Sequence, residues 1–170
     1  KNCYSCHVVP QEKLVNVGGH PAGSKFDLVA WSQGEIRHNL WYNDGKENRP
    51  GSANRQRIMH VVGVAVELET ALRSVGNATQ RKAYAVYMAR RAAAARAKVT
   101  AMAKILSSVP ELAQMAKIGN SAGLKLNNGK ELNAAADKVA AVTKKLAAKY
   151  DGSTFGAVDA SLPGADKYKG

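Results

Sequence analysis

The stretch from Ala53 to Gly76 reads ANRQRIMHVVGVAVELETALRSVG, and it decides which kind of fold this chain can form. Apolar side chains recur in it at spacings of three and four residues: Ile58, Val61, Ala65, Leu68 and Leu72. That period predicts an α-helix with one apolar stripe, because 3.6 residues complete a helical turn. Ser52 or Asn54 can cap the start of this helix, and Gly76 can end it. Other elements must cover the stripe.

Three downstream segments also have the composition of helices. Residues 80–108 (QRKAYAVYMARRAAAARAKVTAMAKILSS) are rich in strong helix formers, and Asn77 or Thr79 can cap them. Residues 110–119 begin with proline, which the first position of a helix accepts. Residues 130–150 carry another apolar stripe: Leu132, Ala136, Val139, Val142 and Leu146. We therefore predict a mainly α protein, with an irregular N-terminal haem-binding region followed by a bundle of three or more helices.

The chain divides into three parts that together form one domain. Residues 1–52 are interrupted by glycine and proline, and residues 27–42 (DLVAWSQGEIRHNLWY) are their best helical stretch. Residues 53–150 form the predicted helical bundle. Residues 151–170 are rich in Gly, Asp and Ser, and we expect them to form an extended C-terminal tail that lies on the body or is partly mobile.

The composition points to a bulky bound group and a charged partner. Hydrophobic residues make up 45% of the 170 residues, but Phe, Trp and Tyr supply only 6%, so the core is poor in large side chains. The formal net charge is +12, and most of it lies after residue 76, where sixteen Lys and Arg face six Asp and Glu. Such a field favours an acidic protein partner, an anionic membrane surface or nucleic acid. No run of 18 apolar residues predicts a transmembrane helix.

The N-terminal stretch KNCYSCH (residues 1–7) contains the only two cysteines of the chain, Cys3 and Cys6. C-x-x-C-H is the attachment sequence of c-type haem, in which the thiols form thioethers with the haem vinyl groups and the histidine binds iron. A zinc site needs about four ligands, and a thioredoxin-like dithiol needs a βα context, so both fit poorly. A disulfide would leave His7 without a role. We predict one covalently attached haem c, with His7 as the proximal ligand.

This prediction carries a location with it. Haem c is attached outside the bacterial cytoplasm, so we expect a periplasmic or extracellular protein from which a signal peptide or an upstream segment has been removed. Nucleic-acid binding by the basic helices does not suit a haem protein in that compartment.

The sixth iron ligand is the open question. His20 ranks first, because it lies in the glycine-flanked loop VNVGGHPAGS, whose backbone can pass close to a flat ring. His38 ranks second and His60 third. The methionines are weaker candidates, because helix packing explains all of them: Met59, Met88, Met102 and Met115. An open sixth position would instead permit ligand binding or catalysis.

Other side chains can surround the haem. Cationic groups able to pair with its propionates are Lys25, Arg37, Arg49, Arg55 and Arg57. Aromatic residues that can form its walls are Tyr4, Trp31, Trp41 and Tyr42.

The segments NCYSCHVVPQEKLVNVGGH, SKFDLVAWSQGEIRHN and VVGVAVELETALRSV, all within residues 1–76, carry a resemblance. They are similar to the C-terminal region of bacterial multihaem c-type cytochromes related to the tetrahaem electron carrier of ammonia oxidisers. That resemblance implies stacked haems with mostly two histidine ligands, here His7 with His20 or His38. This sequence departs from the family in having one attachment motif. It is therefore either a monohaem protein or a chain whose histidine serves a haem held elsewhere.

The function expected from these features is single-electron transfer between redox partners, with no substrate bond made or broken. Two alternatives remain: a haem-based sensor or ligand-binding module, and a haem-carrying subunit of a larger multihaem complex. Homo-oligomers through the alanine-rich helices are also possible. A peroxidase-type enzyme, with His38 and Glu35 as the acid and base, is the least favoured reading, so we expect a protein that is not an enzyme.

Overall fold

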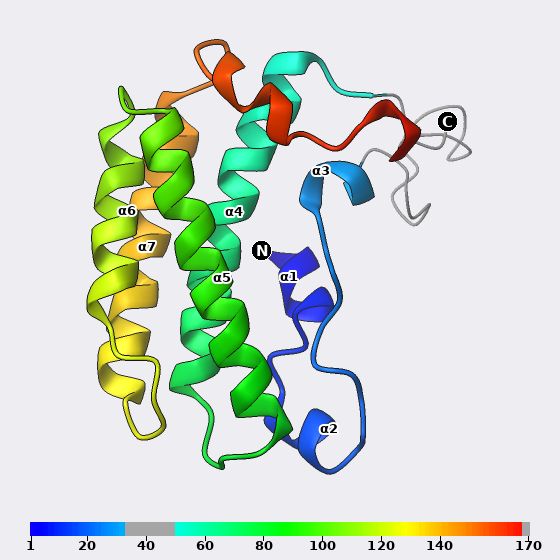
Figure 1. Cartoon of the computed structure of the whole chain (residues 1–170), viewed down its shortest axis with the longest axis vertical. Helices are drawn as coiled ribbons and strands as arrows, with labels where there is room; N and C mark the ends of the chain where they lie inside the picture. Colours follow the sequence, from blue (N-terminus) through cyan, green and yellow to red (C-terminus); the bar gives the residue numbers. More distant parts are fainter. Residues whose placement is uncertain (33–49, 168–170) are drawn as a thin grey trace.

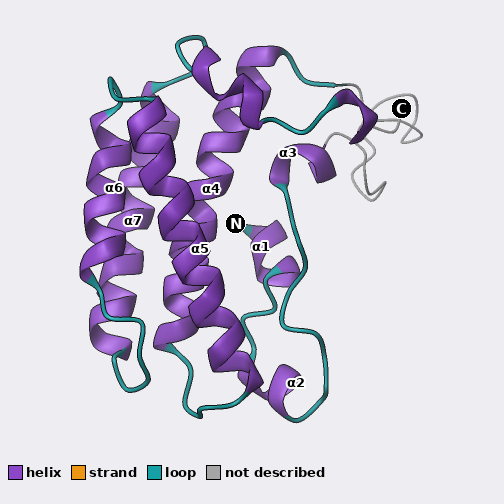
Figure 2. Ribbon diagram, in the orientation of Figure 1, coloured by secondary structure: helices purple, strands orange, loops and turns teal. Residues whose placement is uncertain are grey.

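The computed structural model describes residues 1–32 and 50–167, and within them every regular element is a helix. Figures 1 and 2 show their arrangement. The α-helices are α1 (Asn2–His7), α2 (Glu12–Asn16), α3 (Leu28–Ala30), α4 (Ala53–Gly76), α5 (Ala83–Ile105), α6 (Pro110–Ser121) and α7 (Gly129–Lys149); two 3-10 helices follow, η2 (Gly156–Ser161) and η3 (Ala165–Lys167). The mainly α class is therefore confirmed.

The four longest helices form an up-and-down bundle. α4 packs against α5 and α7, and α6 packs against the same two helices from the other side. The predicted stripes of α4 and α7 are buried at every position named above. Small residues permit close approach: a Cβ on Gly119 of α6 would lie 3.0 Å from Leu68 Cδ2 of α4. Ala92 and Ala95 of α5 are buried in the same way. The apolar period of the sequence thus builds the core.

The helix starts follow the sequence in one case and depart from it in another. Ser52 caps α4, with its hydroxyl accepting from the Arg55 amide at 3.3 Å. The predicted cap of α5 at Asn77 or Thr79 is wrong, because α5 begins at Ala83 after Lys82 and has no side-chain cap. The Thr79 amide and hydroxyl instead donate to the Glu12 carboxylate, at 2.9 and 2.7 Å. Thr79 therefore contacts Glu12 of α2 and does not cap α5.

The N-terminal region is made of short helices that dock on the bundle. The Tyr4 hydroxyl of α1 donates to the Gly63 carbonyl of α4 at 2.8 Å, and Lys1 pairs with Glu69 at 2.6 Å. Asn16 of α2 accepts from the Tyr84 amide at 3.0 Å. Helices of three to six residues are not stable alone in water, so these contacts hold them.

The helix predicted over residues 27–42 is described only at its start. Asp27 caps α3, accepting from the Ala30 amide at 2.9 Å, and Trp31 and Ser32 continue the turn. The remainder of that stretch, with Trp41 and Tyr42, lies outside the described residues.

The C-terminal segment is not the extended tail that we predicted, since it contains η2 and η3. It does lie on the body, because Phe155 and Val158 are fully buried against the bundle. Arg57 of α4 holds it further through a two-pronged contact with Asp159, at 2.6 and 2.7 Å. In the described ranges, no helix combines the length and apolarity that a membrane span requires.

Candidate functional site: the attachment turn and the adjacent cavity

The C-x-x-C-H motif forms α1, a single short helix. Cys3, Cys6 and His7 are spaced i, i+3 and i+4, which places them on one helical face. Both thiols are free; Cys3 is half-buried and Cys6 is exposed. Tyr4, in the same turn, is buried, and its hydroxyl donates to the Gly63 carbonyl. The turn therefore presents two thiols and an imidazole together, while Tyr4 fixes it to α4.

Aromatic rings hold the His7 side chain. Phe26 stacks on the imidazole with centroids 4.6 Å apart and planes 3° apart, and Trp31 meets it edge-on at 4.5 Å. The Ser24 amide donates to the His7 carbonyl at 2.9 Å, which ties the loop to α1. Stacking uses the ring face, whereas a metal is bound by a ring nitrogen at its edge, so the two are compatible. Trp31 was among the predicted wall residues. Phe26 was missed, because no periodicity marks a lone aromatic in a loop.

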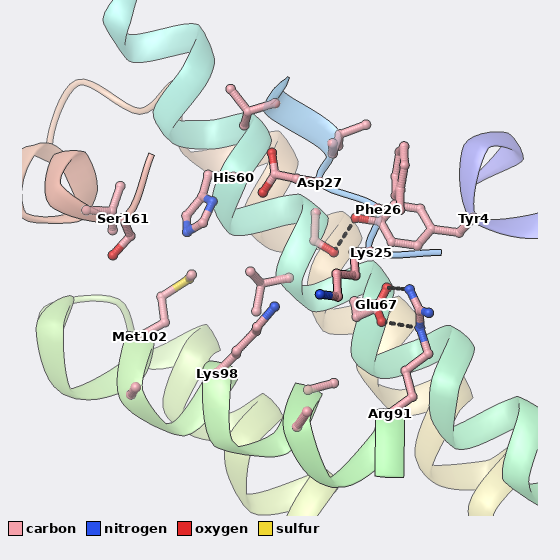
Figure 3. Close-up of a pocket in the computed structure, with 18 of the residues that line it drawn as sticks. Tyr4, Lys25, Phe26, Asp27, His60, Glu67, Arg91, Lys98, Met102 and Ser161 are labelled. Carbon is pink, nitrogen blue, oxygen red and sulfur yellow. Dashed lines mark hydrogen bonds and ion pairs between the residues drawn. The ribbon is translucent and has the colours of Figure 1, made fainter. Parts of the chain in front are cut away.

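A cavity of about 680 Å³ lies behind this aromatic group. Figure 3 shows its lining, which comes from α1, α4, α5, η2 and the segment that runs from residue 24 into α3. Two residues link α1 to the cavity. Tyr4 belongs to α1 and lines the cavity, and Phe26 lines the cavity and stacks on His7. Cys3, Cys6 and His7 are not among the lining residues. Helix α1 and the cavity are therefore adjacent.

Charged groups are unevenly distributed around this cavity. Glu67 and Arg91 form an ion pair at 2.5 Å, and Arg91 also donates to the Ser24 carbonyl at 3.0 Å. Burial lowers the pKa of His60, a change that Asp27 opposes and Lys98 reinforces. Burial, with Glu67 nearby, raises the pKa of the Tyr4 hydroxyl far above its usual value. At neutral pH both His60 and Tyr4 are therefore uncharged.

The structure places two of the three candidates for the sixth ligand. His20 is exposed, and its Nδ1 lies 2.8 Å from the Pro21 carbonyl oxygen in a surface pocket that also contains Tyr87. His60 is half-buried and lines the cavity (Figure 3). His38 lies outside the described residues. Neither His20 nor His60 is shown as a ligand by these placements, and the assignment stays a prediction.

The methionines and the predicted cations can be placed as well. Met88 and Met115 are fully buried in the bundle, Met59 is half-buried, and Met102 is buried at the cavity. Lys25 lines the cavity, and Arg57 is engaged with Asp159. Arg55 is exposed at the start of α4, whereas Arg37 and Arg49 lie outside the described residues.

The residues of α1 fit the attachment of a haem c, because two free thiols and an imidazole share one face of one turn. The zinc alternative finds no ligand set in residues 1–32 and 50–167, which hold no cluster of three or more His, Cys, Asp or Glu able to bind a metal ion. Comparison of the chain with protein-family models, with curated proteins and with solved structures finds no match.

Proposed function

We propose that this chain is an electron-transfer protein with one haem c, attached through Cys3 and Cys6 with His7 as proximal ligand, in the periplasm or outside the cell. The observation that supports it most is the common face of α1 on which the three side chains lie. When bound, a haem c supplies an iron that gains and loses one electron.

The protein's own residues have defined tasks in this proposal. The two thiols form the covalent links, and the stacked Phe26 and edge-on Trp31 hold the imidazole plane of His7 in one orientation. Tyr4 keeps α1 on α4, since its hydroxyl bond to Gly63 is buried. A rigid ligand and attachment turn limit structural change during electron transfer, and no substrate bond is made or broken.

For the sixth ligand we keep His20, His38 and His60. Among the described residues, His60 is the histidine that faces an interior cavity, and it shares that cavity with Phe26, the ring stacked on His7. This placement gives His60 more support than its sequence context did. His20 retains the support of its glycine-flanked loop.

The basic surface suits an acidic redox partner. The exposed lysines of α7 are Lys130, Lys138, Lys144, Lys145 and Lys149. Surface charges of one sign raise the association rate with an oppositely charged partner, and salt weakens the effect.

A second candidate is a haem-carrying subunit of a larger multihaem complex. It is favoured by exposed apolar side chains on two helices that pack together: Leu14 on α2, Val17 just after it, and Val86 and Tyr87 on α5. Such side chains are typical of surfaces that another protein covers.

A visible absorption spectrum of the exported full-length protein tests the proposal. We expect covalent haem that survives denaturation and is lost in Cys3→Ala/Cys6→Ala. Sharp low-spin bands unchanged by carbon monoxide support electron transfer through a six-coordinate iron. A carbon monoxide shift contradicts that reading in favour of an open, ligand-binding site.

The ligand assignment needs three single variants, His20→Ala, His38→Ala and His60→Ala. Only the variant that loses the true sixth ligand should give a high-spin ferric spectrum. Met59→Leu is a matched control on α4, one residue before His60, and it should keep the parent spectrum.

A further inference from the structure

The cavity beside α1 is lined by apolar and cationic side chains, and Cys3, Cys6 and His7 are not among its lining residues. Its volume of about 680 Å³ lies within the range of small-molecule sites. Apolar side chains form most of its wall: Phe26, Leu28, Val64, Met102, Ile105 and Val158. Such a wall suits the apolar body of a ligand.

The charges around the cavity leave an excess of positive groups. Three cationic side chains and two carboxylates line it. Glu67 is paired with Arg91, and Asp27 caps α3. Lys25, in the loop before α3, and Lys98, on helix α5, are both exposed residues at the rim of the cavity, and neither has an ion-pair partner among the described residues.

The two lysines are directed toward the same space. Figure 3 shows the ammonium groups of Lys25 and Lys98 directed into the cavity, both on the same side of the Glu67–Arg91 pair. Two like charges that face one cavity repel each other, and an anion between them removes that repulsion. A carboxylate is the simplest anion that also brings an apolar body.

We propose that this cavity binds a small amphipathic carboxylate, with its head between Lys25 and Lys98 and its apolar body against Met102 and Val64. The recognition of a free carboxylate goes beyond the proposed function and does not rest on it, whereas recognition of a haem carboxylate does. Two sources offer the same chemistry: a free carboxylate of the fatty-acid type, or the propionate side of a haem attached to α1. The shared feature is the recognition of a carboxylate by the two lysines.

Calorimetric titration of the full chain with sodium decanoate tests the proposal. The haem-loaded protein and the Cys3→Ala/Cys6→Ala chain are both titrated, after circular dichroism has shown equal helix content. Decanoate binding to both forms identifies a free carboxylate as the ligand. Binding only to the haem-free chain shows that the haem carboxylates already fill the site.

Substitutions locate the binding. Lys25→Met and Lys98→Met should each weaken decanoate binding about tenfold, which is the loss of one charge-assisted contact. Lys104→Met is the matched control, because Lys104 is exposed on the same helix as Lys98 and does not line the cavity. Ala101→Trp, which adds bulk to the lining, should abolish binding.

The proposal is overturned if decanoate binds neither form. It is also overturned if 1-decanol binds as tightly as decanoate, or if Lys104→Met weakens binding as much as Lys98→Met. The titration of the haem-free chain tests the cavity alone. If decanoate does not bind there, the proposed electron-transfer function is unaffected. If the spectra show no covalent haem, the proposed carboxylate site is unaffected.

Discussion

The bundle of α4–α7 and the N-terminal region of residues 1–32 differ in the apolar surface that each contributes to the core. The bundle is built from helices of 12 to 24 residues whose apolar stripes supply most of that core. The N-terminal region has helices of three to six residues and adds Tyr4, Val8, Val9 and Val15 to the same core. Polar contacts such as Tyr4 to Gly63 and Glu12 to Thr79 hold it further. The bundle therefore supplies most of the stability, and the region with the two cysteines depends on it.

The largest effect is expected from the bundle core. Leu68 of α4 is fully buried and lies against Gly119 of α6. Leu68→Ala leaves a cavity and should lower the free energy of unfolding by about 2–5 kcal/mol in urea denaturation. Leu14→Ala, at a side chain 40% exposed on α2, should change it by only about 0.5 kcal/mol. Equal losses would mean that Leu14 stabilises the fold as much as a fully buried core leucine does, and the comparison would break.

The next effect concerns the C-terminal segment that covers the end of α4. Gly152 has a φ of +92°, and a Cβ there would collide with the Asn54 carbonyl oxygen. Gly152→Ala should therefore cost about 1–3 kcal/mol in thermal or urea unfolding. Gly156→Ala is the control, because its nearest contact for an added Cβ is the Arg57 guanidinium at 3.7 Å. A neutral Gly152→Ala would show that the segment is not docked as described.

A smaller effect is expected where α1 meets α4. Tyr4→Phe keeps the buried ring but removes the 2.8 Å bond to Gly63, which should cost about 1 kcal/mol. Hydrogen exchange of the α1 amides should speed up, while the core amides of α7 stay protected. Tyr87→Phe, at a ring that is 54% exposed, should change neither. If α7 exchange rises with that of α1, the two regions open as one unit.

The smallest effect is local and depends on pH. Burial raises the pKa of Glu12, but hydrogen bonds from Thr79 and Gln80 outweigh it and hold the pKa below the usual value of 4.5. Because the folded pKa is the lower one, this contact stabilises the protein above pH 4.5 and is lost as the pH falls through the folded pKa. The protection of the α2 amides, measured against the intrinsic exchange rate at each pH, should therefore fall severalfold in acid, with little change in global stability.

Glu12→Gln should bring that faster α2 exchange to neutral pH. Glu131→Gln on α7 is the control and should leave α2 unchanged. An α2 exchange rate that does not respond to Glu12→Gln would show that Asn16 and Tyr84 hold the helix without the carboxylate.

The sequence predicted the bundle well and the N-terminal region poorly, for a physical reason. A stripe such as Leu132 to Leu146 repeats over about four turns, so its period survives any single exception. The start of α5 had no such repetition, and Thr79, one of the caps chosen from local rules, bonds to Glu12 instead. Phe26 was missed in the same way, because its stacking on His7 joins loop and helix across 19 residues. The common face of Cys3, Cys6 and His7 was predictable because their spacing lies within one turn.

By itself, the sequence determined the helical class, three long helices, the short helix after Pro110, and the presence of two thiols and an imidazole on one turn. These features depend on residues close together in the chain, and helical geometry alone relates them. Only the tertiary structure decided that His60 faces a cavity, that His20 lies at the surface and that Lys25 and Lys98 share a space. Those relations depend on how α4, α5 and the loop before α3 pack, and packing is set by shape and burial across the whole chain.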